Sequence, residues 1–406
     1  VALANNPATR ASWMTAKAAA SHEASARADY FPEIDLGAQV IRQKSGSGGG
    51  RSAYQQTVWG PTAAVNFLLL DFGGRGSRVQ QARDALIAAD FAHNATIQNV
   101  VLRVAQAYYG YLNAKTLLSA QESTVREMQA NYDAAEARHR AGVATIADVL
   151  QAKTSLSQAQ LVLESIHGTV QTVQGSLAVA AGLPATTTFE VGLLPPSVPA
   201  TQVGESIDSL IDRAVRARPD LLQMRALAER AHARIREVRS QGLPTLSLSS
   251  SGSRNDYTGD LQPSTNYSFG LQLRLPVYTG MKNAFDVREA RALAEAADAQ
   301  ALSFQQQVEL EVWSSYFDLK TAQRRVAVAH DLLASAEESE KVAAGRYKEG
   351  VGSILDLLTA QAALENARAE EITARSDWFL SLAQLAHDIG SIDLGEATGA
   401  QSTEIQ

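Results

Sequence analysis

The feature of this sequence that most constrains its fold is a turn that occurs twice. Residues 138–150 read Arg-His-Arg-Ala-Gly-Val-Ala-Thr-Ile-Ala-Asp-Val-Leu, and residues 346–358 read Arg-Tyr-Lys-Glu-Gly-Val-Gly-Ser-Ile-Leu-Asp-Leu-Leu. Because the offset of 208 residues is about half of the 406-residue chain, the match predicts two copies of one large unit. The identical pairs are Arg138/Arg346, Gly142/Gly350, Val143/Val351, Ile146/Ile354, Asp148/Asp356 and Leu150/Leu358.

The first copy begins with a helix and a pair of strands. The pattern predicts a helix over residues 2–29, capped at Asn6. Alternating residues predict strands at 34–41 and about 57–72, on either side of a Gly/Ser-rich loop at 45–52.

A very long helix follows the strands. From Gly74 to about Ala141 the chain has no proline, and apolar residues recur at helical spacing. This predicts one helix of about 68 residues, roughly 100 Å long at the rise of an α-helix. Such a length is typical of a coiled-coil rod or tube and not of a compact globule. After the turn at Gly142, a return helix runs to Ala181.

The second copy repeats this plan. A helix is predicted over residues 207–241, a strand from Leu246, a loop at 255–265 and a strictly alternating strand at 267–275. A second long helix runs to the turn at Gly350, and a return helix follows it.

These elements divide the chain into four parts. We expect a first structural repeat at 1–182, a Pro-rich linker at 183–206, a second repeat at 207–390 and a polar C-terminal tail at 391–406. The start at Val1, without Met or a signal sequence, favours a processed chain.

Composition excludes several classes of protein. The chain has no Cys, which excludes disulfides and Cys-ligated metal sites, and its net charge of −7 without a basic stripe argues against nucleic acid. The sequence contains no run of 18 apolar residues, so no membrane-spanning helix is predicted. The His residues lack ligand spacing, and neither a nucleophile–base arrangement nor a phosphate-binding loop is found. We therefore expect no metal, no cofactor and no enzymatic activity.

The strands predict an oligomer. Four strands cannot close a barrel, which needs about eight or more. An open sheet with Tyr267, Phe269 and Leu271 on one face would expose apolar surface and strand edges. Three chains of four strands predict a mixed α/β membrane protein, a trimeric 12-stranded antiparallel β-barrel continued by a long α-helical barrel of coiled helices. The alternative is a soluble sheet packed on a helical bundle.

The order of motifs resembles a known family. Tyr-Phe-Pro32 follows the first helix, Asp71-Phe-Gly-Gly-Arg75 follows the first strand pair, and Arg138-x-x-x-Gly-Val forms the turn. With their repetition, these features resemble the outer membrane efflux proteins, the TolC- and OprM-like channels, over nearly the whole chain. The resemblance implies a homotrimer in the outer membrane with a large periplasmic portion, around which the linker and the C-terminal segment form a belt.

The resemblance also implies a function and partners. It implies a passive exit duct of a tripartite efflux pump that contacts outer membrane lipid, a periplasmic adaptor (membrane fusion) protein and an inner-membrane RND or ABC transporter. The same architecture in a type I protein-secretion system stays open as an alternative. A soluble periplasmic coiled-coil or adaptor protein is a more remote one, because adaptors carry a single helical hairpin.

Two carboxylates beside the turns are candidates for a gate. Thr145-x-x-Asp148 and Ser353-x-x-Asp356 match the capping box of a helix start. Under threefold symmetry, Asp356 would also form a ring of carboxylates, which favours cations. The resemblance places Thr359 where the family pattern has a second acidic residue.

Three further residues complete the predicted periplasmic gate. Tyr347 matches the tip Tyr of the family and would hydrogen-bond to Asp148. Arg138 and Arg346 complement the ends of their helices or form salt bridges across the tip. The resemblance makes the two turns adaptor-docking loops, although Gly352 replaces a tip Arg of the family pattern. These docking residues are Gly142, Val143, Ala144, Thr145, Gly350, Val351, Gly352 and Ser353.

Overall fold

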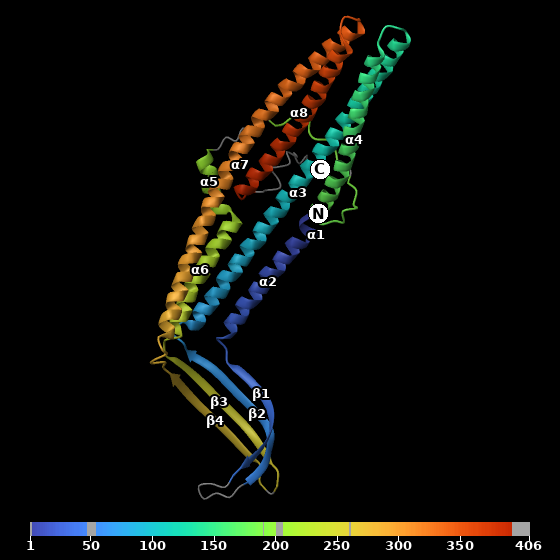
Figure 1. Cartoon of the computed structure of the whole chain (residues 1–406). Coiled ribbons are helices and arrows are strands. Elements are labelled where there is room, and N and C mark those ends of the chain that lie inside the picture. The colour runs from blue at the N-terminus through green and yellow to red at the C-terminus, as the bar shows by residue number, and fades with distance from the viewer. Residues whose placement is uncertain (1, 47–53, 190, 200–205, 260, 392–406) are drawn as a thin grey trace, which may run out of the picture. The chain divides into compact units, whose positions relative to one another are not determined.

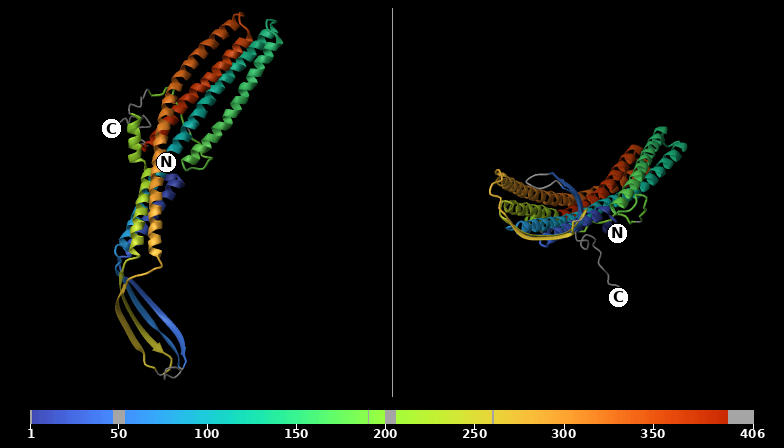
Figure 2. Two further views of the ribbon diagram at one scale, coloured as in Figure 1. Left: turned by 60° about the vertical axis from the view of Figure 1, so that its left-hand side comes forward. Right: turned by 90° about the horizontal axis from the view of Figure 1, so that it is seen from below.

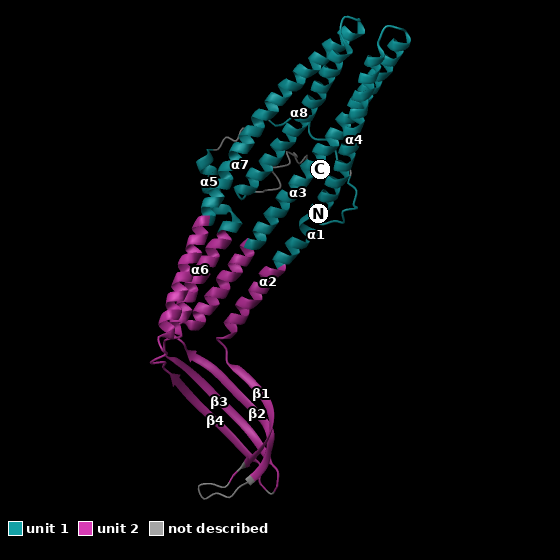
Figure 3. Cartoon of the chain, in the orientation of Figure 1, with its two compact units in different colours: residues 1–13, 92–221, 304–406 teal, residues 14–91, 222–303 magenta. Residues whose placement is uncertain are grey.

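The structure is a computed structural model that describes residues 2–46, 54–189, 191–199, 206–259 and 261–391 (Figure 1). The predicted loop tip at 45–52 and the C-terminal tail therefore lie largely outside the described residues. By its internal contacts the chain divides into two compact units (Figure 3). The helical unit comprises residues 1–13, 92–221 and 304–406, and the sheet unit comprises 14–91 and 222–303.

The order of elements confirms the duplication. The first half contains α1 (Ala2–Asn5), α2 (Pro7–Ala28), β1 (Glu33–Ser45), β2 (Tyr54–Leu70), α3 (Gly74–Arg140) and α4 (Ile146–Ala180). The second half contains α5 (Ile207–Ala217), α6 (Pro219–Ser240), β3 (Thr245–Tyr257), β4 (Ser264–Arg274), α7 (Lys282–Lys348) and α8 (Ile354–Asp388). The copies agree closely in length, since α3 and α7 have 67 residues each and α4 and α8 have 35 each.

Two predicted helices are broken where the sequence analysis made them continuous. The first ends at Asn5 and restarts at Pro7, and the second ends at Ala217 and restarts at Pro219. A proline disfavours the helical conformation of the residue before it, and Arg218 has an extended backbone with ψ of 118°. Asn6 acts as the predicted cap, because its Oδ1 accepts a hydrogen bond from Ala8 N at 2.9 Å.

The sheet unit contains one antiparallel sheet in the order β1-β2-β3-β4. Its strands curve together (Figure 2). The predicted loop at 255–265 is too long, because Asn255 pairs with Ser264 and the Tyr257 hydroxyl lies 2.7 Å from Ser264 Oγ. Within the chain, β1 and β4 each pair on one side only. The side chain of Tyr267 on β4 is 90% exposed, and Leu36 on β1 is 83% exposed.

The helical unit holds the best-buried core. Val308 and Val312 of α7 pack with Leu221 and with Trp378 of α8, and all four are almost fully buried. The described part of the linker packs onto α3 and α8. Buried Leu194 contacts Leu112 and Ile372, and its N–H donates to Thr116 Oγ1 at 3.0 Å.

Candidate functional site

The two turns of the duplicated motif have the same backbone. Gly142 and Gly350 have φ of 77° and 75°, in the left-handed region that favours glycine. In each turn, the following valine donates to the carbonyl of the arginine five residues earlier at 3.0 Å. The glycine N–H donates to the carbonyl three residues back, at 2.8 Å in the first turn and 3.2 Å in the second. This pair of bonds defines a Schellman motif, which ends α3 and α7 alike.

Both return helices begin with the predicted capping box. Thr145 N donates to Asp148 Oδ2 at 2.8 Å, and Asp148 N donates to Thr145 Oγ1 at 3.2 Å. Ser353 N donates to Asp356 Oδ2 at 3.3 Å, and Asp356 N donates to Ser353 Oγ at 3.1 Å. The capping role of both carboxylates is therefore confirmed.

The surroundings of the Asp356 carboxylate favour its ionised form. Its side chain is exposed, and hydrogen bonds from the Ser353 hydroxyl and backbone N–H hold the pKa of this carboxyl below its usual range. The charge of Arg346 lowers the pKa further. A carboxylate with these properties stays ionised at neutral pH.

The two arginines of the motif have different surroundings. The guanidinium of Arg138 lies over the ring of Tyr347, 4.8 Å from its centroid, and its Nη1 donates to Tyr347 O at 3.2 Å. That carbonyl belongs to the last turn of α7, so Arg138 places its positive charge at the negative end of another helix. Arg346 is exposed. Neither arginine forms an ion pair with a residue that the structure describes, so the salt bridge across the tip is absent there.

The predicted hydrogen bond between Tyr347 and Asp148 is wrong for this structure. The Tyr347 hydroxyl is buried and has no hydrogen-bond partner among the described residues. One oxygen of Asp148 is already held by Thr145 N. Burial raises the pKa of the Tyr347 hydroxyl; the Arg138 charge opposes this rise, and the Asp148 charge adds to it. The phenol is therefore neutral at physiological pH, and Tyr347 contacts Arg138 where Asp148 was expected.

The docking residues of the two turns are mostly open to solvent. Val143 and Val351 are exposed, as are both turn glycines. Gly352 is an exception, because a Cβ there would lie 3.0 Å from Arg346 Cβ. This loop leaves little room for the Arg that the family pattern has at that position.

A groove of about 510 Å³ lies between α4 and α8 beside the turns. Thr359 lines it together with exposed Leu150 and Leu355, so its wall is largely apolar. The other lining residues are Gln151, Thr154, Ser155, Leu358 and Ala362. Thr359 occupies the position where the family pattern has an acidic residue, and it therefore contributes a hydroxyl group to a largely apolar wall.

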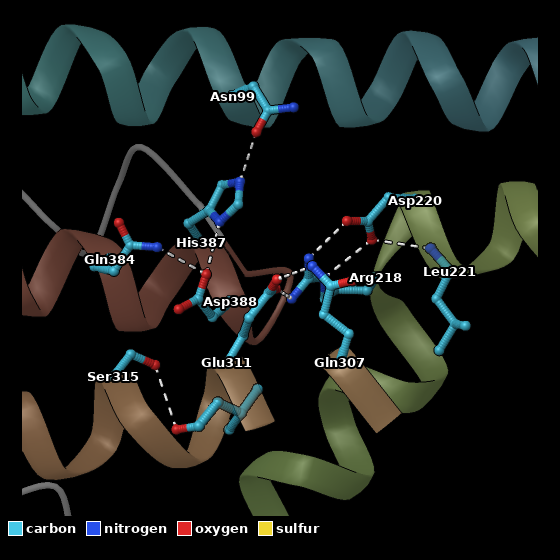
Figure 4. A network of polar contacts seen from close by, with 11 residues as sticks. Asn99, Arg218, Asp220, Leu221, Gln307, Glu311, Ser315, Gln384, His387 and Asp388 are labelled. Carbon is cyan, nitrogen blue, oxygen red and sulfur yellow. Dashed lines mark hydrogen bonds and ion pairs between the residues drawn. The ribbon is translucent and has the colours of Figure 1, made fainter. Parts of the chain in front are cut away.

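A buried arginine that the sequence analysis missed holds the break between α5 and α6 (Figure 4). Arg218 donates to both oxygens of Asp220, at 3.0 and 2.6 Å, and to Glu311 Oε2 of α7 at 2.5 Å. Its side chain is 5% exposed, against 28% and 34% for its two partners. Burial disfavours the charged guanidinium, but the two carboxylates outweigh it and raise the pKa of Arg218. The Pro at 219 signalled this break, but Glu311, 93 residues away, left no local signal.

A second polar cluster lies beside it at the end of α8 (Figure 4). His387 has Nδ1 2.9 Å from Asp388 Oδ1 and Nε2 2.9 Å from Asn99 Oδ1 of α3. Gln384 Nε2 donates to the same Asp388 oxygen at 2.9 Å. These contacts join the end of α8 to α3 and leave the buried Asp388 with hydrogen-bond partners.

The described residues contain no cluster of three or more His, Cys, Asp or Glu side chains able to hold a metal. Among the helices that the structure describes, none combines the length and hydropathy needed to cross a membrane.

Comparison with known proteins identifies the duplicated unit. The family model described as "Outer membrane efflux protein" matches residues 1–183 and again 210–391. Protein CyaE of Bordetella pertussis is 27% identical over 380 residues, which cover 92% of this chain and 78% of the relative. The probable efflux pump outer membrane protein TtgC of Pseudomonas putida is 25% identical, with 90% of this chain and 76% of the relative covered.

The fold also matches solved structures. A membrane protein from Pseudomonas aeruginosa superposes with a TM-score of 0.87 over 96% of this chain and 91% of that protein, at 24% identity. The likeness in fold therefore extends over both units and both repeats.

Proposed function

Because the chain belongs to the outer membrane efflux protein family, we propose that it is the outer-membrane exit duct through which a tripartite pump expels its substrates. Transport through it is passive, and the chain is a channel and not an enzyme. A periplasmic adaptor protein and an inner-membrane RND or ABC transporter supply the other two parts. The naming of one relative as a probable efflux pump outer membrane protein supports this assignment.

The observation that carries the proposal is the sheet with two open edges. Strands β1 and β4 pair on one side only, and their exposed side chains include Leu36, Tyr267 and Phe269. An open edge and an apolar face are unfavourable in water. Three chains joined edge to edge give 12 strands, which close the edges and turn the apolar face to outer membrane lipid. Each of the two repeats, 1–182 and 207–390, then contributes one strand pair, and the linker at 183–206 joins them.

The helical units of the three chains would form a periplasmic α-helical barrel with a gate at the turns. The α3–α4 and α7–α8 pairs of one chain are coupled by Arg138 over Tyr347. Opening separates these two pairs and breaks that contact. Threefold symmetry repeats Asp356 into a ring of permanent charge, which favours cations. The remaining gate residues are Asp148, Thr359 and Arg346.

The exposed turns would dock to the adaptor. Val143 and Val351 project from the two turns and offer apolar contacts. The shared backbone of the two Schellman turns means that one adaptor surface can bind either copy. The docking set is Gly142, Val143, Ala144, Thr145, Gly350, Val351, Gly352 and Ser353.

Two measurements test this function. We expect light scattering of the detergent-purified protein to give three chain masses per particle. We also expect a planar bilayer to show a small conductance that favours cations. A monomer that needs no detergent and gives no conductance would contradict the proposal.

A further inference from the structure

Two large apolar residues of the sheet unit have a backbone conformation that normally belongs to glycine. Phe72 has φ of 47° and Met281 has φ of 65°, and within the described residues no other non-Gly residue has positive φ. Each lies next to a glycine that also has positive φ, Gly73 at 92° and Gly280 at 65°. Bulky residues at positive φ are strained.

The two residues occupy equivalent turns, each between a strand and a long helix. Gly74 N donates to Asp71 O at 3.1 Å around Phe72, and Lys282 N donates to Thr279 O at 3.2 Å around Met281. Two successive positive φ values in such a turn are usually supplied by Gly, Asn or Asp. In both copies of the duplicated unit, a large apolar side chain takes one of the two positions.

Packing inside the protein does not explain this choice. Phe72 is 52% exposed and Met281 is 55% exposed. Strain of this kind persists where the surrounding structure enforces it and is typical of functional positions. Arg75 enforces the first turn, because it lies over the ring of Tyr30 and donates to Leu69 O at 3.0 Å and Asp29 O at 3.3 Å.

Exposed apolar residues also flank strands β1, β3 and β4 at the same end of the sheet. Phe31 precedes β1, Leu243 precedes β3, and Val277 and Tyr278 follow β4. The pairing of Leu70 with Leu246 and of Thr245 with Arg274 places β2, β3 and β4 ends together. All four strand ends therefore present apolar side chains beside polar turns.

This band continues the exposed apolar face of the edge strand. On β4, the alternating residues Tyr267, Phe269, Leu271 and Leu273 are all exposed. The same stripe passes through Leu275 and Val277 to the turn at Met281. An apolar stripe that ends in aromatic side chains and polar turns is suited to contact with a lipid bilayer, in which amphipathic rings lie at headgroup level.

We infer that Phe72 and Met281 are paired anchors that insert into the lipid headgroup region where the sheet ends, and that their strained turns exist to direct them there. The inference rests on the proposed membrane function and adds the residues that fix the depth of the sheet. Lipid is favoured as the occupant because the band is continuous with the apolar stripe of β4.

Single-cysteine labelling tests this directly, because the chain has no native Cys. Phe72→Cys and Met281→Cys are labelled with an environment-sensitive dye and reconstituted in phosphatidylcholine vesicles. Leu271→Cys on β4 serves as the membrane control and Val143→Cys at the first turn as the water control. Each label is then quenched by aqueous iodide, by lipid with a nitroxide near the headgroup, or by lipid with a nitroxide deep in the acyl chain.

The expected result separates three depths. The labels at 72 and 281 should be quenched at least twofold more by the headgroup nitroxide than by the deep one, and Leu271→Cys should show the reverse. If iodide quenches the labels at 72 and 281 as strongly as the label of Val143→Cys, the inference about the anchors is wrong. Quenching of Leu271→Cys by the deep nitroxide would still support the membrane channel in that case. Protection from iodide and from both nitroxides would mean that another copy of the chain covers the band, which also overturns the inference. No quenching of Leu271→Cys by either lipid nitroxide would contradict the proposed function itself.

A strain-relieving variant distinguishes an anchor from a folding residue. Asn tolerates positive φ, so Phe72→Asn keeps the turn and removes the apolar group. We expect unchanged or higher thermal stability in detergent and at least a twofold lower yield of reconstitution into vesicles. Lower stability in detergent with unchanged reconstitution would show that Phe72 serves folding alone and would contradict the inference.

Discussion

The two repeats of this chain have turns of the same backbone conformation, but equivalent side chains in the two repeats make different contacts. Both turns end in a Schellman motif at a glycine and restart in a capping box. Yet Arg138 lies over Tyr347 of the other repeat, whereas its twin Arg346 is exposed. Duplication therefore preserved what local sequence dictates, and long-range contacts diverged.

The helix breaks differ in the same way. In the first repeat, Asn6 caps α2 and donates to Ala180 O at 3.3 Å, as a neutral side chain at the end of α4. In the second repeat, Arg218 holds the break with two carboxylates. The first repeat thus uses a neutral cap and the second an ionic cluster for one architectural purpose.

The largest loss of stability is expected from a variant that tests the difference between the two helix breaks. Arg218→Ala leaves Asp220 and Glu311 without their cation, which should lower the free energy of unfolding by about 2–3 kcal/mol, because the carboxylates are partly exposed and can be resolvated. Asn6→Ala removes a helix cap and should lower it by about 1 kcal/mol. Denaturant unfolding in detergent compares the two, with Arg218→Lys as the variant that keeps the charge but loses the bidentate geometry. Equal effects of Arg218→Ala and Asn6→Ala would remove the contrast.

The second prediction sharpens the similarity of the repeats. Gly142→Ala and Gly350→Ala each place a Cβ at positive φ, and each should lower the free energy of unfolding by about 1–2 kcal/mol. Because both turns have the same backbone, the two values should agree within experimental error. A difference above about 1 kcal/mol would show that one turn is not determined by its local sequence.

Local sequence explains why these turns could be predicted. The glycine, the Thr145 and Ser353 caps and the carboxylates three residues later all act within one turn of helix, so their spacing alone specifies their hydrogen bonds. The length of α3 followed from the absence of proline between Gly74 and the first turn.

The contacts that were missed all join distant parts of the chain. Arg138 and Tyr347 are 209 residues apart, and Arg218 and Glu311 are 93 apart. The expected partner of Tyr347 was wrong, because Asp148 bonds to Thr145 within its own helix start and the Tyr347 ring contacts Arg138 of the other repeat. Sequence spacing does not reveal which of several nearby partners wins such a competition.

A third prediction tests the divergence of the arginines. Arg138→Gln loses the contact with the Tyr347 ring and should lower the free energy of unfolding by about 1 kcal/mol. Arg346→Gln should change it by less than about 0.5 kcal/mol, as for an exposed surface residue. Unfolding curves of both variants in one detergent give the comparison. A larger loss for Arg346→Gln would reverse our account of the two tips.

The smallest expected effect concerns acid. The lowered pKa of Asp356 means that its stabilising contribution is complete at neutral pH and is lost as the pH falls through the lowered pKa of the folded state. Asp356→Asn removes this dependence, so the thermal midpoints of the wild type and the variant should converge in acid. A gap between them that widens on acidification would contradict the assigned sign.

The most direct test of the central claim is the single-channel conductance of the wild type beside Arg138→Gln and its twin Arg346→Gln in a planar bilayer. Our account predicts a small, cation-favouring conductance that rises at least twofold in Arg138→Gln and changes much less in Arg346→Gln, because of these two arginines only Arg138 contacts the other helical pair. Equal conductance in all three proteins would contradict the gate at Arg138 and Tyr347, and no conductance in any of them would contradict the duct itself.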